Sequence, residues 1–413
     1  MPVFFCILYL LAIESMARAE NSLIGQTIEA NISKISESGH GVIHYQGFDI
    51  VVANTIRHER VLIEVTGRRK SFLVGTLKET LKSSPVRMQP ACHLFGTCTG
   101  CQWQHIEYAA QLLMKQEEVR IRLSDALPEV SVQVEPTIPS PAIYGYRNHA
   151  RFTSRRGMLG FVGALSHKFI PVSQCMLMND GINYWLTKLQ GNSTQTSQVA
   201  IRSGQNTGDY LIQPTMESPP VGVPTGQSTF TETLGESRFR IGSPSFFQVN
   251  SAQTMNLVAE VISGFDFAQE TVVVDAYAGV GTLAVLVAPY VQKVLAVEES
   301  FSAIEDARIN IEGHLNIEII QGKTELVLKD LSEHIDALIL DPPRSGCHPD
   351  AINSVRDIAP TNLIYVSCDP LSLGRDLALL MPDLYDIEKI QPVDMFPHTH
   401  HIECIVSLRL KSQ

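Results

Sequence analysis

Hydrophobic and polar positions alternate in short runs near the start of the chain and form continuous apolar runs near its end. Between residues 21 and 82, five runs alternate with a period of two, and glycine or polar turns separate them. The runs are 27–32, 41–45, 48–52, 61–65 and 72–76. Period-two alternation is typical of half-buried strands. Five short strands within about sixty residues predict a small closed β-barrel of the oligonucleotide-binding kind.

The middle of the chain has a mixed pattern. Residues 103–127 place apolar side chains at helical spacing and predict a long amphipathic helix. A segment that combines tyrosine and arginine follows at 144–152 and predicts a strand. Residues 190–232 are rich in Thr, Ser, Gly, Pro and Gln, and we expect irregular strands and loops there.

The last third of the chain contains apolar runs at 271–275, 294–297, 337–340 and 363–366. Each run ends in turn residues, and helical patterns follow the first and the last of them. Uninterrupted apolar strands that alternate with helices predict an open α/β sheet with both faces covered.

Three strand ends in this region carry reactive side chains. Asp341 follows one apolar run, Cys368 follows another, and Glu403 begins a final strand. Open α/β sheets bind their ligands at the carboxyl ends of their strands. A lone cysteine in a strand is usually only a small hydrophobic residue. A thiol accompanied by two carboxylates at strand ends predicts an active site instead.

A glycine turn precedes these strand ends. Gly279 and Gly281 separate strand 271–275 from the helix after it, and glycine lets the backbone approach a ligand closely. Glu298 ends the next strand, about 20 residues further on, where an acidic residue binds ribose hydroxyls. A nicotinamide cofactor and S-adenosylmethionine (SAM) both satisfy this pattern, so the turn by itself leaves both open.

Length and charge limit the class of protein. The chain has 413 residues, which predicts two or three domains, and its net charge is −11. The negative charge excludes a nucleic-acid binder that is basic over its whole surface. No Asp or Glu lies between residues 136 and 179, and this window can present a positive surface to RNA phosphates. Its cations are Arg147, Arg151, Arg155, Arg156 and Lys168.

Four of the eight cysteines have unusual spacing. Cys92, Cys98 and Cys101 follow the pattern C-x5-C-x2-C, and Cys175 comes after a long gap. A disulfide framework is not expected in a chain of this length. Three thiols on one loop with a distant fourth suit a soft metal centre, and the spacing fits either zinc or an iron–sulfur cluster.

The first 20 residues permit two interpretations. Residues 3–13 are largely apolar, and Ala17-Arg18-Ala19 is similar to the cleavage site of a secretory signal. No Lys or Arg precedes the apolar run, which favours an over-extended gene start with Met16 as the initiator. The run is too short to span a membrane, and we expect a cytoplasmic protein.

Three motifs in order resemble the signature of the RNA (uracil-5-)-methyltransferase family. They are DPPRSG at 341–346, SCDP with GRDL between 367 and 377, and DMFPHTHHIE at 394–403. Together with FFQVN at 246–250 and the cysteine pattern, they are similar to the iron–sulfur branch that methylates 23S ribosomal RNA. The resemblance extends over nearly all of the chain after residue 20.

The resemblance implies a multidomain α/β protein. After the leader or over-extended start at 1–20, it implies an RNA-binding TRAM domain, an OB-like barrel, at 21–82. A central, mostly β domain at 83–240 would bind RNA and carry a [4Fe–4S] cluster. Residues 241–413 would form a Rossmann-like, SAM-dependent methyltransferase domain.

The resemblance also implies roles for single residues. Cys368 would add to C6 of the uracil ring, because C5 is a poor nucleophile until the ring becomes an enolate. Glu403 would remove the C5 proton as the general base. The implied donor-binding residues are Gln248, Tyr277, Thr282, Glu298 and Asp341. The implied cluster ligands are Cys92, Cys98, Cys101 and Cys175.

The resulting hypothesis is SAM-dependent C5-methylation of a uridine in 23S ribosomal RNA. The target base must leave its stack to be reached, so we expect a uridine in a loop. RNA is the expected partner, and we expect no membrane and no protein partner. The alternatives are methylation of the transfer-RNA T-loop uridine, a catalytically inactive RNA-binding protein, and a nicotinamide oxidoreductase that uses the glycine turn.

Overall fold

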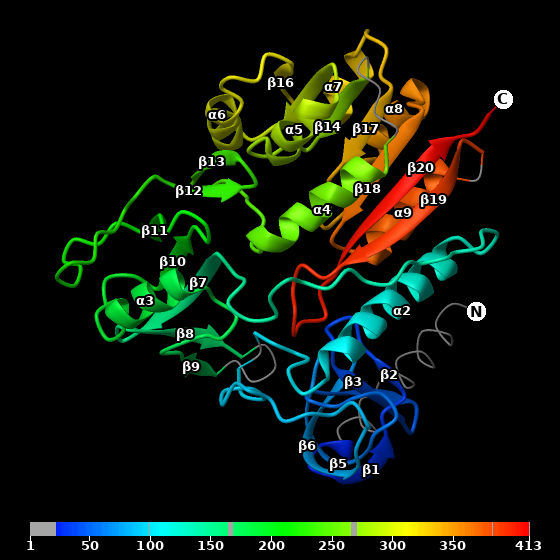
Figure 1. The fold of residues 1–413 in the computed structure, drawn as a ribbon. Coiled ribbons are helices and arrows are strands. Elements are labelled where there is room, and N and C mark those ends of the chain that lie inside the picture. The colour runs from blue at the N-terminus through cyan, green and yellow to red at the C-terminus, as the bar shows by residue number, and fades with distance from the viewer. Residues whose placement is uncertain (1–21, 99, 164–167, 266–270, 382, 413) are drawn as a thin grey trace, which may run out of the picture. The chain divides into compact units, whose positions relative to one another are not determined.

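The computed structural model describes residues 22–98, 100–163, 168–265, 271–381 and 383–412 (Figure 1). The leader expected at 1–20 lies outside these residues. The chain divides into two compact units. The N-terminal unit consists of residues 1–111, 162–170 and 398–400, and the C-terminal unit consists of 112–161, 171–397 and 401–413. Each unit is described by itself below.

Six strands form one sheet in the N-terminal unit, in the order β1-β5-β6-β4-β3-β2. All neighbours are antiparallel except β4 and β6. The strands are β1 (Thr27–Asn31), β2 (Lys34–Ile35), β3 (Gly41–Tyr45), β4 (Phe48–Val52), β5 (Arg60–Arg68) and β6 (Leu73–Lys82). The five strands predicted from alternation are confirmed, because their apolar positions form one buried cluster. Closure into a barrel stays a prediction, since β1 and β2 are the sheet's edges within the described residues.

The predicted long helix is present as α2 (Tyr108–Ala126), which begins five residues later than its apolar pattern. The side chain of Gln111 explains the later start. Its Nε2 donates hydrogen bonds to the carbonyls of Trp103 at 3.1 Å and Ile106 at 2.9 Å. Those bonds hold residues 103–106 in turns, where a helix would use the same carbonyls for its own ladder.

The middle of the chain contains more strands than its composition suggests. Four of them lie side by side and antiparallel in the order β11-β10-β7-β8. The region also contains a two-stranded hairpin and one helix, and the side chain of Asn179 caps that helix. The elements are β7 (His149–Arg155), β8 (Met158–Val162), β9 (Phe169–Pro171), α3 (Asp180–Leu189), β10 (Gln198–Ser203), β11 (Tyr210–Gln213), β12 (Thr229–Leu234) and β13 (Ser237–Gly242).

A seven-stranded sheet in the order β16-β15-β14-β17-β18-β20-β19 organises the rest of the C-terminal unit. The first five strands are parallel, and β20 is antiparallel to both of its neighbours. The strands are β14 (Val272–Ala276), β15 (Lys293–Glu298), β16 (Ile317–Gln321), β17 (Ala337–Leu340), β18 (Asn362–Ser367), β19 (Tyr385–Val393) and β20 (Glu403–Leu410). The order reverses between β14 and β17, and the carboxyl edge at such a switch point is where these sheets bind ligands.

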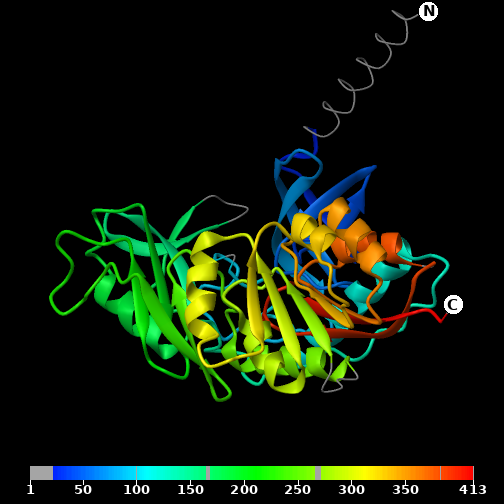
Figure 2. The same ribbon diagram turned by 90° about the horizontal axis from the view of Figure 1, so that it is seen from above.

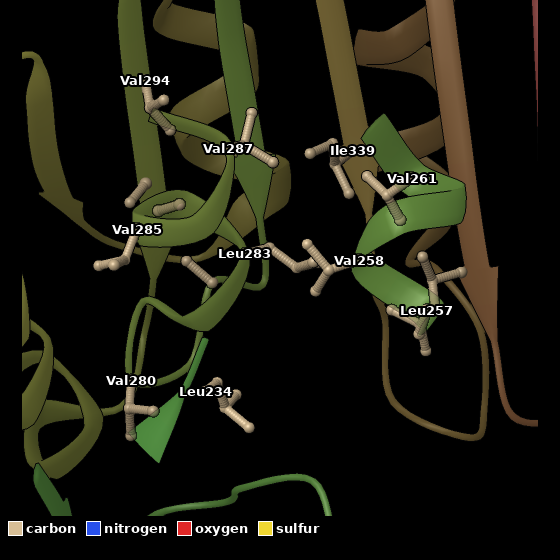
Figure 3. Close-up of a cluster of buried hydrophobic side chains, with 14 of the residues drawn as sticks. Leu234, Leu257, Val258, Val261, Val280, Leu283, Val285, Val287, Val294 and Ile339 are labelled. Atoms are coloured by element: carbon tan, nitrogen blue, oxygen red, sulfur yellow. The ribbon is translucent and has the colours of Figure 1, made fainter. Parts of the chain in front are cut away.

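Helices cover both faces of this sheet (Figures 1 and 2). On one face Leu283 of α5 and Val258 of α4 point toward each other beside Ile339 of β17 (Figure 3). On the other face α8 and α9 pack with Val119 and Leu123 of α2. The helices are α4 (Ser251–Ser263), α5 (Thr282–Val287), the 3₁₀ turn η1 (Ala288–Tyr290), α6 (Phe301–Asn310), α7 (Thr324–Asp330), α8 (Pro349–Ile358) and α9 (Pro370–Leu380). The double cover explains why β17 and β18 are continuous apolar runs.

A search of the described residues for a helix long and apolar enough to cross a membrane finds none.

Candidate active site

Strand pairing brings Cys368 and Glu403 to the same edge of the sheet. Ser367 at the end of β18 faces Cys404 of β20, so Cys368 and Glu403 are the next residues beyond that pair. Asp341 follows β17, which lies beside β18 with Leu340 opposite Tyr365. The three predicted residues therefore meet at the carboxyl end of the parallel strands.

The turn after Cys368 is set by its own sequence. Asp369 caps α9 by accepting a hydrogen bond from the backbone N–H of Ser372 at 3.0 Å. Pro370 occupies the first turn of the helix, where its missing N–H is not needed. Strand β18 therefore ends and α9 begins within two residues, which leaves the thiol at the turn itself.

The thiol of Cys368 is a weak acid in this environment. Burial, followed by the nearby carboxyl groups of Glu403 and Asp341, raises its pKa to about 12, while Arg344 acts in the opposite direction. The thiol is consequently protonated at neutral pH before a substrate is bound. A cationic ligand, or a base that accepts its proton, is needed to activate it.

Glu403 is almost inaccessible, with 5% of its surface exposed. Burial, and then the proximity of Asp341, raise the pKa of its carboxyl group well above the usual value. Its Oε2 atom is buried and has no hydrogen-bond partner among the described residues. A buried polar atom without a partner is uncommon and suggests that a ligand completes the site.

Two further carboxyl groups lie in the same region. Burial raises the pKa of Asp341 to about 7. Asp275 is the penultimate residue of β14. Burial, and then the charge of Asp341, raise the pKa of its carboxyl group to about 8. The sequence analysis did not select Asp275. Its position just before the glycine turn, at the end of an apolar strand, was the signal that could have identified it.

The glycine turn has the backbone that its sequence predicts. Gly279 and Gly281 have φ values of 56° and 82°, and Tyr277 also adopts a positive φ of 67°. Glu298 holds the turn, because one carboxylate oxygen accepts from the N–H of Gly279 at 2.8 Å and the other from Ser300 at 2.7 Å. Thr282 begins α5 directly after this turn.

The segment that carries Gln248 is held in place by hydrogen bonds to its backbone and to its neighbours. Asn148 donates its side-chain N–H to the carbonyl of Gln248 at 2.9 Å. Asp306 of α6 accepts from the hydroxyl of Ser245 and from the N–H of Gly242, each at 2.6 Å. The neighbouring Asn310 donates to the carbonyl of Val280 in the glycine turn at 2.9 Å. Helix α6 thus fastens both predicted donor-binding segments.

A second network supports the loop after Asp341. Asp376 accepts hydrogen bonds from the hydroxyl of Tyr365 at 2.6 Å and from the N–H of Cys347 at 2.8 Å. Arg375 donates to Asp376 and to the carbonyl of Ser345. The GRDL motif therefore holds the DPPRSG loop in place. Arg344, within the same loop, lies 3.8 Å from a carboxylate oxygen of Asp369, and its side chain is 66% exposed.

The four predicted metal ligands lie in different units. Cys92, Cys98 and Cys101 belong to the N-terminal unit, and Cys175 belongs to the C-terminal unit. Gln104 links two of them, since its Oε1 accepts from the N–H of Cys92 and its Nε2 donates to Cys101 Sγ, both at 3.2 Å. Within the described parts of the chain, no three Cys, His, Asp or Glu side chains are gathered as metal ligands. The structure therefore does not present a formed ligand set, and the cluster stays a prediction.

Comparison with known proteins agrees with a transferase fold. The family model described as tRNA (Uracil-5-)-methyltransferase matches residues 235–411. An uncharacterised RNA methyltransferase of Clostridium acetobutylicum is 30% identical, and the alignment covers 92% of this chain and 96% of that relative. Another, from Listeria monocytogenes, is 31% identical over 94% of this chain and 98% of its own length.

Among solved structures, the tRNA (uracil-54, C5)-methyltransferase of Pyrococcus abyssi, in complex with S-adenosyl-L-homocysteine, has a similar fold. The TM-score is 0.73 at 24% identity, and the match covers 92% of this chain and 100% of that one. The fold and the relatives together define an RNA methyltransferase. The chain belongs to the tRNA (uracil-5-)-methyltransferase family.

Proposed function

We propose that this protein methylates C5 of a uridine in RNA, with SAM as the methyl donor. The observation that carries the proposal is the buried Oε2 atom of Glu403, which has no hydrogen-bond partner among the described residues and belongs to a carboxyl group near the thiol of Cys368. C5-methylation requires a nucleophile on one side of the base and a proton acceptor within reach of C5. These two side chains supply both groups from neighbouring strands.

In the proposed reaction the thiol of Cys368 first loses its proton to solvent, and the thiolate then forms a bond from Sγ to C6 of the uracil ring. The electron pair moves to C5, which takes the methyl group and releases the sulfur of the donor as a thioether. Glu403 then accepts the C5 proton, and the C6–Sγ bond breaks to restore the aromatic ring and the thiolate. Atoms and charge balance without any further reactant.

The unusual acidities of the site suit this sequence. A raised pKa favours the neutral form of the Glu403 carboxyl group, whereas Glu403 must be ionised to act as a base. The sulfonium charge of SAM favours the ionised forms of Asp341, Asp275 and Glu403 by opposite-charge attraction. Binding of the donor would therefore charge the base before the proton has to leave.

We assign donor binding to the two segments that α6 fastens and to the loop after β17. Glu298 would accept hydrogen bonds from ribose hydroxyls, because both its oxygens are already oriented by backbone N–H groups. Gln248, Tyr277, Thr282 and Asp341 would form the rest of the donor site. None of these assignments involves a metal.

A positive region near β7 supports binding of an RNA backbone. Burial, and then the charges of Arg202, Arg147 and Arg151, lower the pKa of His149 to about 3. Three arginines therefore lie close to His149, and a cluster of cations in a chain with a net charge of −11 is suited to phosphate groups. We favour 23S ribosomal RNA as the substrate, because the cysteine pattern resembles that branch. Transfer RNA is the alternative, and the solved structure of similar fold is named for that activity.

We further propose that Cys92, Cys98, Cys101 and Cys175 bind a [4Fe–4S] cluster and that the N-terminal sheet is a TRAM barrel. Thiolates are the ligands that such clusters use. The test is iron and sulfide analysis of anaerobically purified protein, in parallel with the Cys98→Ser and Cys101→Ser variants. About four irons per chain in the unaltered protein, lost in both variants, would support the cluster. One zinc ion per chain in place of iron would show that these cysteines bind zinc and not a cluster.

The decisive experiment for the function offers labelled SAM with transcripts of 23S ribosomal RNA and, separately, of transfer RNA. Label at C5 of a 23S uridine is the expected result, and label only in transfer RNA would select the other substrate. Cys368→Ala should abolish labelling, and Cys404→Ala, the matched buried thiol on β20, should retain it. Persistence of methylation in Cys368→Ala would refute the mechanism. SAM binding without labelling of either RNA would favour an inactive RNA-binding protein.

A further inference from the structure

Asn250 lies where the donor segment meets the segment that leads to Glu403. It is 1% exposed, and it follows Gln248 by two residues at the start of α4. Its Oδ1 accepts from the N–H of Gln253 at 3.2 Å and caps the helix. Its Nδ2 donates to the hydroxyl of Ser140 at 3.0 Å and to the carbonyl of Met395 at 3.2 Å.

Met395 belongs to residues 394–397, which directly follow β19 on the way to β20. Contacts from several elements hold this segment in place. Lys115 of α2 forms a fully buried ion pair with Asp394 at 2.6 Å and also donates to the carbonyl of Phe396 at 3.2 Å. Tyr146 donates its hydroxyl to the carbonyl of Pro397 at 3.1 Å. Among the residues that hold 394–397 in place, Asn250 is the one that belongs to the FFQVN segment.

A second connection joins the same two segments through Ile138. The carbonyl of Ile138 accepts from the N–H of Asp394 at 2.9 Å and from the side chain of Gln253 at 3.1 Å. Helix α4 and residues 394–397 therefore share anchors at two points. Asn250 provides the only one of these contacts that starts within two residues of Gln248.

Capping alone does not require an asparagine. Serine caps a helix about as well, through its hydroxyl oxygen, but it has no second donor that could reach Met395. The amide nitrogen of Asn250 is thus the part of the side chain that a merely structural cap leaves unused. Here that amide group joins two loops that approach the site from different elements.

We propose that Asn250 is a positioning residue that keeps Gln248 on the donor side and Glu403 on the base side in one fixed geometry. The inference rests on the proposed function. Methyl transfer and removal of the C5 proton occur on the same ring carbon, so both groups must be placed at once. A displacement of about 1 Å between them can lower a rate by about 10²-fold.

The variant that tests this is Asn250→Ser, which keeps the cap and removes the amide nitrogen that donates to Met395 and to Ser140. Other hydrogen bonds still anchor the segment that carries Gln248. Asn148 donates to the carbonyl of Gln248 and to the hydroxyl of Ser251, and that hydroxyl donates to the buried Glu232 at 2.6 Å. We therefore expect folded protein with a Tm only a few degrees lower, and Asn250→Thr is a second capping variant if the first is unstable. The matched control is Ser263→Ala at the other end of the same helix, where the exposed hydroxyl donates to the carbonyl of Glu260 at 2.9 Å.

The assay uses transcripts that contain [5-³H]uridine and measures tritium release in a single turnover, together with methyl incorporation from SAM and the Kd for SAM. We expect tritium release in Asn250→Ser to fall about 10- to 100-fold. We expect the Kd for SAM to change by less than about threefold, and the methylated protein–RNA adduct to accumulate. Ser263→Ala should match the unaltered protein in every measurement.

Two results would overturn the inference while the function stands. One is release of tritium by Asn250→Ser at the rate of the control, and the other is a loss that weaker SAM binding explains completely. Absence of tritium release by the unaltered protein, with both RNA transcripts, would remove the proposed function and this inference together. That outcome is visible before any variant is measured.

Discussion

Glu403 lies one residue beyond the pair formed by Ser367 and Cys404, and its carboxyl group raises the pKa of the Cys368 thiol. In the proposed reaction these two groups act on adjacent atoms of one ring, and their positions on neighbouring strands bring them close together. Because the two groups are close, ionisation of one of them makes ionisation of the other less favourable. The predictions below follow from that competition and from the contacts that support the site.

Glu403→Gln should block the reaction after methyl transfer. The amide has the size of the carboxyl group but cannot accept the C5 proton, so the covalent bond from Cys368 to C6 cannot break. We expect a protein–RNA complex that resists denaturing electrophoresis and carries label from SAM. Turnover should fall by at least about 10²-fold. Normal turnover by Glu403→Gln would assign the base to another residue.

Affinity for SAM should increase with pH. Asp341 and Asp275, with pKa values of about 7 and about 8, are largely neutral at pH 6 and become charged by pH 9. Their ionised forms attract the sulfonium ion, so the Kd for SAM should fall over this interval. S-adenosylhomocysteine has no sulfonium charge and should show a flatter profile in the same calorimetric titration. Equal profiles for the two ligands would contradict the electrostatic account.

The ligand-free protein should lose stability as pH rises, and Asp275 should be one cause. Burial raises its pKa from the ordinary value of 3.8 to about 8, so its contribution is complete below about pH 4 and is lost as pH rises through 8. Asp275→Asn removes the titration and keeps the size. We expect the difference in Tm between pH 5 and pH 9 to be smaller in this variant, by differential scanning calorimetry. The exposed Asp350→Asn serves as a control, and a change of the same size there would contradict the assignment.

Lys115→Met should destabilise the C-terminal unit strongly. It leaves Asp394 buried without its cation, and breaking a buried ion pair from one side costs about 3–5 kcal/mol. The double variant Lys115→Met/Asp394→Asn should recover part of the loss, because no uncompensated charge remains. Urea unfolding of the single and double variants measures this difference. A double variant less stable than Lys115→Met would refute the explanation.

Local patterns in the sequence predicted many elements correctly. Alternation gave the five strands of the N-terminal sheet, because one face of each strand is buried and the other is exposed. The uninterrupted apolar runs gave β14, β15, β17 and β18, since helices cover both faces of that sheet. The strands between residues 190 and 232 were less clear, because β10, β11 and β12 are short and lie among polar turns.

Other features depended on contacts between distant segments. The insertion of β20 between β18 and β19 is not encoded in the apolar pattern of any one strand, although it determines that Glu403 meets Cys368. The late start of α2 results from the side chain of Gln111, which competes for backbone carbonyls. Asp275 acquired its significance only from burial beside Asp341.

The sequence by itself indicated the strand ends and the glycine turn, and it selected Asp341, Cys368 and Glu403 as candidate site residues, because turn residues, caps and apolar periodicity act over a few neighbouring positions. Only the tertiary structure decided which of these residues meet, how strongly burial shifts their acidities, and which side chains hold them. Register, desolvation and hydrogen bonding between distant segments depend on the complete packing of the chain, so Asn250, Asp275 and Lys115 became visible only in the folded protein.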